Sequence, residues 1–124
     1  MLGHKKMVIW GNIERIEDAV YNKILLNIPK NCFNYLDQIE RATTSIGANF
    51  VEGYYSGSIK EYLRFLGYSR RSLAELNNWA NQVYRKKFIS KGLFDMFEDL
   101  TIKTLYLFNR LIYALKKKLI DIKP

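Results

Sequence analysis

The residues able to carry acid–base or nucleophilic chemistry are few and scattered. The chain has one histidine, His4, and one cysteine, Cys32, and neither has an adjacent base in the sequence. A nucleophile needs a base within hydrogen-bond reach, so neither residue indicates an active site. The sequence also lacks a phosphate-binding loop, a dinucleotide glycine fingerprint and the Cys/His spacing of a metal site. We expect no catalytic residue, metal or cofactor, and we interpret His4 as exposed near the terminus.

Carboxylates leave one enzymatic alternative open. Glu52 and Glu75 fall close to apolar helical seams, where partial burial beside Arg41 or Arg64 would perturb their ionisation. Ion pairs of this kind are more often structural than catalytic. An enzyme built on such a cluster is therefore the least favoured hypothesis.

The charge balance is the stronger signal. Twenty Lys and Arg against twelve Asp and Glu give a net charge of +8 over 124 residues. Such a balance favours anionic partners, with nucleic acid first and acidic proteins or lipid surfaces second. The alternative is that the charge only keeps the protein soluble. Residues 59–87 carry seven positive and two negative groups, so the excess is concentrated in the second half of the chain.

We predict that nucleic acid is bound by cations of the last two predicted helices and the turn between them, most of which have weak local compensation. Local i,i+4 partners are present for Asp37–Arg41, Arg71–Glu75 and Asp99–Lys103, and such exposed pairs contribute only about 0.3–0.5 kcal/mol each. The predicted contacts are Lys60, Arg64, Arg70, Arg85, Lys86, Lys87, Lys91, Lys116, Lys117 and Lys118. Phosphate neutralisation would make binding weakly sequence-specific and strongly salt-dependent.

Helical periodicity must position these cations. Over residues 59–83, apolar or small residues recur in steps of three and four, which is the pattern of a bundle helix. Ser58 followed by Glu61 is the pattern of a capping box at the start of this helix, which we predict to run to about Arg85. Similar patterns predict helices over about 12–28, 31–55 and 93–118, with Asn12 and Ser90 as N-caps. Small residues crowd the second of these helices, and Gly47 there suggests a packing requirement.

Together these helices predict an all-α protein, an antiparallel up-down-up-down four-helix bundle. We assign residues 1–11 to an N-terminal arm, 12–118 to the bundle and 119–124 to a C-terminal tail. The sequence shows neither a signal peptide nor an apolar run long enough to span a membrane, so we expect a cytoplasmic protein without a membrane partner.

The last predicted helix has a second apolar row, which suggests a further covered surface. We favour a subunit interface made by Phe94, Leu105, Phe108 and Ile112, over the alternative that this helix is buried on several sides of a monomer. A ring-like homo-oligomer would array the basic residues in two belts, because 85–91 and 116–118 lie at opposite ends of this helix.

One stretch carries a family resemblance. The run RATTSIGANFVEG at 41–53 resembles the signature of the four-helix-bundle proteins encoded by intervening sequences in bacterial large-subunit ribosomal RNA genes. Ser58, Lys60–Glu61, 64–66 and 72–76 continue the match, which spans most of 10–118. Phe50–Val51 stands where Ile-Ala is commoner, and Tyr54–Tyr55 is bulkier than usual.

The resemblance implies a cytoplasmic four-helix bundle, often a ring-shaped pentamer, with no established enzymatic activity. The same superfamily includes the accessory variability protein of diversity-generating retroelements, a basic pentamer that binds nucleic acid and a reverse transcriptase. By analogy, the resemblance implies RNA or RNA–DNA and a reverse transcriptase as partners. A protein–protein scaffold docking an acidic partner is the alternative function.

Overall fold

The computed structural model describes residues 1–122, and in them the chain forms four α-helices and no strand. The helices are α1 (Val8–Ala19), α2 (Phe33–Tyr54), α3 (Ile59–Arg85) and α4 (Lys91–Ile122). A 3₁₀ turn, η1 (Gly3–Lys6), precedes α1, and a π-helical turn, η2 (Val20–Ile24), and a 3₁₀ turn, η3 (Leu25–Asn27), follow it. The predicted all-α fold with a four-helix bundle is therefore confirmed.

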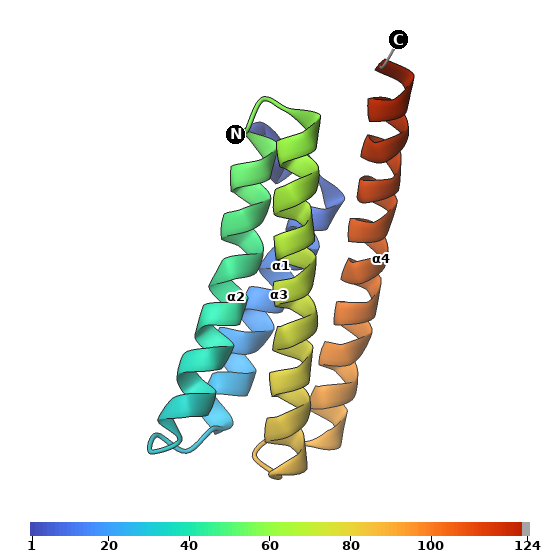
Figure 1. Cartoon of the computed structure of the whole chain (residues 1–124). Coiled ribbons are helices and arrows are strands. Elements are labelled where there is room, and N and C mark those ends of the chain that lie inside the picture. Colours follow the sequence, from blue (N-terminus) through green and yellow to red (C-terminus); the bar gives the residue numbers. More distant parts are fainter. Residues whose placement is uncertain (123–124) are drawn as a thin grey trace.

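Short loops connect the long helices. Figure 1 shows α2 joined to α3 at one end of the molecule and α3 joined to α4 at the other. The beginning of α3 and the end of α4 consequently lie at the same end. This placement decides which cations can act together.

Helix α3 begins and ends where the sequence predicts. The Ser58 hydroxyl accepts a hydrogen bond from the Glu61 backbone N–H at 3.3 Å, as the capping pattern requires. Gly57, just before it, has a φ of 78°, a left-handed conformation that favours glycine. From residue 66 onward the predicted seam is buried at every turn, with Leu66, Leu73 and Leu76 fully covered.

The N-terminal segment differs from the predicted arm. Helix α1 begins at Val8, and Asn12, predicted as a cap, lies inside it and donates to the Thr104 hydroxyl at 3.3 Å. The prediction that His4 is exposed is wrong, because only 4% of the residue is accessible. Its ring packs edge-on against the Trp10 ring, with 4.5 Å between the ring centroids, and its Nδ1 lies 3.0 Å from the Tyr55 hydroxyl oxygen. Aromatic packing thus holds this segment on the bundle.

Helix α4 extends past both predicted limits. The cap at Ser90 is confirmed, since its hydroxyl accepts from the Leu93 N–H at 3.1 Å, but the helix already begins at Lys91. At the other end it runs to Ile122, so residues 119–122 of the predicted tail are helical. The remaining two residues of that tail, 123–124, lie outside the described residues.

The row of α4 predicted as a subunit interface belongs to the core of the single chain. Phe108 is fully buried, Phe94 and Ile112 are each 6% exposed, and Leu105 is half-buried against the same core. The face points inward because α4 packs against both α1 and α3. The alternative interpretation, a helix buried on several sides, is the correct one for these residues.

Small residues let α2 and α3 approach closely. A Cβ added at Gly53 would lie 2.9 Å from the Phe65 Cβ and 3.3 Å from the Tyr62 backbone oxygen. The Ser69 hydroxyl donates to the Ile46 carbonyl at 2.7 Å across the same contact. Gly47 is less constrained, since its added Cβ would meet the Trp10 ring at an ordinary 3.5 Å. Gly53 is therefore the glycine that the packing requires.

Glu17 of α1 is a carboxylate near the core whose ionised form is disfavoured by its surroundings. Burial raises its pKa above the usual 4.5, and the charges of Glu14 and Asp18 raise it further. Its Oε2 lies 3.7 Å from the position of a Cβ on Gly47, so it faces α2.

None of the helices in residues 1–122 combines the length and apolar content that crossing a membrane requires.

We predict that Gly53→Ala lowers the free energy of unfolding by about 1–3 kcal/mol, because the new methyl group forces α2 and α3 apart. Gly47→Ala is the matched control. It removes a helical glycine without a clash, so it should leave stability unchanged or raise it by up to about 1 kcal/mol. Urea denaturation followed by circular dichroism measures both, and equal effects of the two substitutions would contradict the packing assignment.

We also predict that Glu17→Gln raises the melting temperature at pH 7 by roughly 2 °C. The folded pKa of Glu17 is raised, so stability falls as the pH rises from the unfolded value of 4.5 through the folded value. At pH 3, where the carboxyl is protonated in both states, the substitution should change nothing. A lower melting temperature at pH 7 would show that the ionised carboxylate stabilises the fold.

Candidate nucleic-acid interface

The register of α3 against α4 brings cations from both helices together. The Arg70 Nη1 donates to the Asn109 Oδ1 at 2.8 Å, which pairs the middle of α3 with the middle of α4. Nearer the end of the bundle, a hollow of about 280 Å³ is lined by Ile59 and Tyr62 of α3 and by Leu115 and Lys118 of α4. The N-terminal half of α3 therefore lies beside the C-terminal half of α4.

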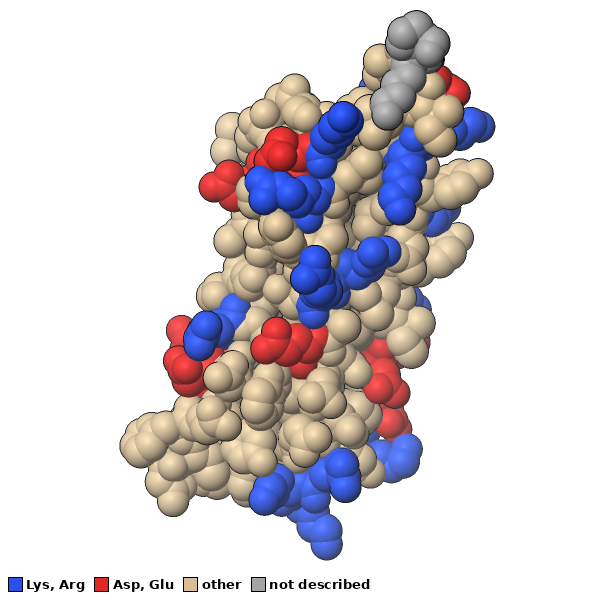
Figure 2. All heavy atoms as spheres, in the orientation of Figure 1, with Lys and Arg blue, Asp and Glu red and all other residues tan. Residues whose placement is uncertain are grey.

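These two half-helices together carry eight cations, which we group under the name α3–α4 basic face. It consists of Lys60, Arg64, Arg70, Arg71, Arg110, Lys116, Lys117 and Lys118. Figure 2 shows Lys and Arg side chains scattered over this part of the molecule. Six of the ten predicted contact residues belong to the face, and the structure shows that the two half-helices that carry them are neighbours.

The other four predicted residues form a separate group, the turn cluster, made by Arg85, Lys86, Lys87 and Lys91. It lies at the opposite end of the bundle, where Figure 2 shows a second gathering of cations. Lys87 has a φ of 65°, and its N–H donates to the Tyr84 carbonyl at 2.8 Å, which turns the chain tightly. A shallow hollow of about 500 Å³ lies between Arg85, Lys87 and Lys91. The two cationic groups are thus distinct, as the sequence predicts.

Arg64 is the most constrained cation of the basic face. Its Nη2 lies 2.6 Å from the Glu61 Oε2, and its Nη1 donates to the Tyr68 hydroxyl at 3.3 Å. The hydrogen bond from Arg64 lowers the pKa of Glu61, so this pair remains ionised at neutral pH. Both side chains are about half exposed, and the pair orients the guanidinium more than it stabilises the fold.

Tyrosines support two further arginines that were not predicted as contacts. The Arg71 Cζ lies 5.3 Å above the Tyr68 ring, and the Arg110 Cζ lies 5.8 Å above the Tyr106 ring. Such cation–π contacts hold a guanidinium in place without neutralising it. The spacing of an arginine three or four residues from a tyrosine on one helix is the signal that would have found them.

Local ion pairing follows the predictions only in part. Two of the predicted pairs form: the Arg41 Nη1 lies 3.9 Å from the Asp37 Oδ2, and the Lys103 Nζ lies 2.9 Å from the Asp99 Oδ2. The predicted Arg71–Glu75 pair is not formed; Glu75 instead accepts from the Trp79 Nε1 at 3.4 Å. Lys91, expected to lack a partner, binds Asp95 at 2.6 Å, which raises the pKa of Lys91.

The structure does not place the carboxylates as the enzymatic alternative assumed. Glu52 and Glu75 are both exposed, although the sequence suggested partial burial for one of them. The buried carboxylate–arginine cluster that this alternative requires is therefore not formed by these two residues.

A model of one protein family matches residues 5–110, and that family is described as 23S rRNA-intervening sequence protein. The matched span includes α1, α2, α3 and the first two thirds of α4. A search of the curated proteins finds no match.

Proposed function

The chain belongs to the 23S rRNA-intervening sequence protein family, and we propose that its function in that family is non-enzymatic binding of nucleic acid through the α3–α4 basic face. The partner is RNA or an RNA–DNA hybrid, and the protein acts as an accessory factor in a complex with a reverse transcriptase. This proposal takes the class of partner from the net charge of +8 and the family resemblance.

The observation that carries the proposal is that eight cations lie on two half-helices that pack side by side. Within residues 1–122, Arg64 alone among these eight has an acidic partner within 4.0 Å. Uncompensated Lys and Arg side chains release the counterions condensed on a phosphate backbone when they bind it. Arg64, Arg71 and Arg110 are held by neighbouring side chains, so they lose less conformational freedom on binding. Contacts of this kind position the sugar–phosphate backbone of a nucleic acid but do not distinguish its base sequence.

Assembly extends the surface. We propose that antiparallel bundles associate into a homo-oligomer, with a homopentameric ring as the arrangement that the resemblance implies. Repetition of the basic face and of the turn cluster around a ring would give two belts of cations. Phosphate contacts add up along such belts, and affinity rises without any stronger single contact.

A protein–protein scaffold is the second candidate function. Arg64 and Lys91 each hold a carboxylate oxygen of their own chain at 2.6 Å, so the same cations are able to bind an acidic protein surface. In that case nucleic acid would be secondary, and its binding would not depend on the basic face.

We predict that a single-stranded 20-nucleotide RNA binds with an affinity that falls steeply with salt. The double substitution Lys60→Gln/Lys116→Gln should lower the slope of log K against log [KCl] by about 1.4, because two phosphate contacts are lost. Fluorescence anisotropy over a series of KCl concentrations measures the slope.

The control carries the same change in charge at two exposed sites away from the basic face, Lys30→Gln/Arg41→Gln, and should keep the wild-type slope. A wild-type affinity that does not respond to salt would remove the proposed function. A control that lowers the slope as much as the test variant would remove the assignment to this face.

A further inference from the structure

The outward side of α4 carries a regular stripe that the single chain leaves uncovered. Its apolar members are Met96, Tyr106, Tyr113 and Ile120, and its charged members are Asp99, Lys103, Arg110 and Lys117. In sequence order the eight residues alternate in steps of three and four, which is the spacing of a seam between two helices. The stripe lies opposite the side on which Phe97, Thr104 and Phe108 are buried.

This stripe, which we call the outer stripe, exposes large apolar side chains. Tyr106 is 60% exposed, Tyr113 is 72% exposed and Ile120 is 70% exposed. Three such residues aligned on one helix are more than the scattered apolar side chains of an ordinary surface. The pattern therefore indicates that another helix covers this side of α4.

The order of charges along the outer stripe selects the partner helix. If two copies of α4 lay side by side in the same direction, Asp99 would face Asp99, and each cation would face its own copy. Like charges in direct opposition are destabilising. A parallel pair is therefore disfavoured at four of the eight positions.

The opposite direction makes every pair complementary. In an antiparallel seam, the register in which facing residue numbers add up to 216 keeps the steps of three and four in phase and pairs all eight residues of the stripe. Asp99 then meets Lys117, Met96 meets Ile120, Tyr106 meets Arg110 and Lys103 meets Tyr113. The last two are cation–π pairs, and Arg110 already lies 5.8 Å above Tyr106 of its own helix.

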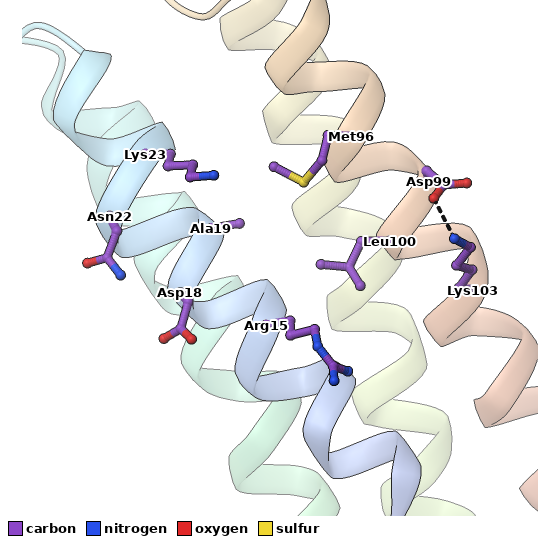
Figure 3. A pocket seen from close by; sticks show the side chains of 9 residues that line it. All are labelled: Arg15, Asp18, Ala19, Asn22, Lys23, Met96, Asp99, Leu100 and Lys103. Atoms are coloured by element: carbon purple, nitrogen blue, oxygen red, sulfur yellow. Dashed lines mark ion pairs between the residues drawn. The ribbon is translucent and has the colours of Figure 1, made fainter.

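A cavity stands at the end of the outer stripe where Ile120 of a second copy would arrive. It has a volume of about 380 Å³ and lies between α1 and α4, with Ala19, Met96 and Leu100 as its apolar lining. Figure 3 shows Met96 and Leu100 directed toward α1, whereas Asp99 and Lys103 point outward. Arg15, Asp18, Lys23 and Asp99 border the same cavity, so its rim carries both signs of charge around the apolar lining. An apolar side chain such as that of Ile120 suits this lining.

We propose that two copies of this chain associate through the outer stripes of α4, running in opposite directions, with Ile120 of each copy over the α1–α4 cavity of the other. The contact is isologous, so every pair forms twice. It joins two chains, or two rings, because a two-fold contact cannot close a ring by itself. A single pair of helices buries little area, so the association should be measured at micromolar to millimolar chain concentrations.

The test reverses the charge of Asp99 and then compensates for that change by reversing the charge of its proposed partner, Lys117. Asp99→Lys opposes Lys117 of the second copy, and should weaken the association at least tenfold, which at intermediate concentration lowers the weight-average mass most of the way to that of the unassociated form. Lys117→Asp should have the same effect. The double variant Asp99→Lys/Lys117→Asp restores opposite charges and should recover the wild-type mass. Sedimentation equilibrium of the full chain, without nucleic acid, measures the mass of each variant.

Asp37→Lys is the matched control, since Asp37 is an exposed carboxylate with an i,i+4 cationic partner on α2, just as Asp99 is on α4. It should keep the wild-type mass, and circular dichroism confirms that each variant is helical. The proposal is overturned if the wild type stays a single chain at the highest concentration. It is equally overturned if Asp99→Lys keeps the wild-type mass or if the double variant does not recover. None of these outcomes bears on RNA affinity, which the anisotropy series tests separately.

Discussion

The close approach of α2 and α3 is the constraint on which the rest of the structure depends. Gly53 leaves no room for a Cβ between these helices, and Ser69 bonds across them to the Ile46 carbonyl. With one side of α3 fixed in this way, its leucine seam faces the core and its arginines face solvent. The cationic surface is thus a consequence of helix packing, because the side of α3 opposite its buried seam faces solvent.

Helix α4 contributes to the core, to the basic face and to the outer stripe through different parts of its surface. Its inner side completes the core with Phe97 and Phe108, its C-terminal half adds cations to the basic face, and its outer stripe remains open. Arg110 and Lys117 belong to both the basic face and the outer stripe, and the stacking of Arg110 on Tyr106 holds that guanidinium in position. Pairing through the outer stripe and nucleic-acid binding would therefore be neighbours on one helix, and assembly would place two basic faces on one particle.

The sequence predicts the helices well because their signals are local. The bounds of α3 follow from Ser58, Gly57 and a periodic seam, all within one segment. Contacts between distant residues could not be predicted from these local signals. The burial of His4, for example, depends on Trp10 and Tyr55, which are 6 and 51 residues away. The same limit explains why Phe94 and Phe108 were assigned to an interface, since periodicity identifies an apolar row but not what covers it. It also explains why the two halves of the basic face were not predicted to be neighbours, because the Arg70–Asn109 register spans 39 residues.

Mapping the sites at which RNA touches the protein tests the central claim most directly. An RNA that contains 4-thiouridine, cross-linked by light at moderate salt, marks the peptides that lie against it, and mass spectrometry identifies them. The account predicts that cross-links concentrate on peptides covering 60–71 and 110–118, from both halves of the α3–α4 basic face. Cross-links spread over the chain in proportion to its Lys and Arg content, or confined to α2, would contradict it.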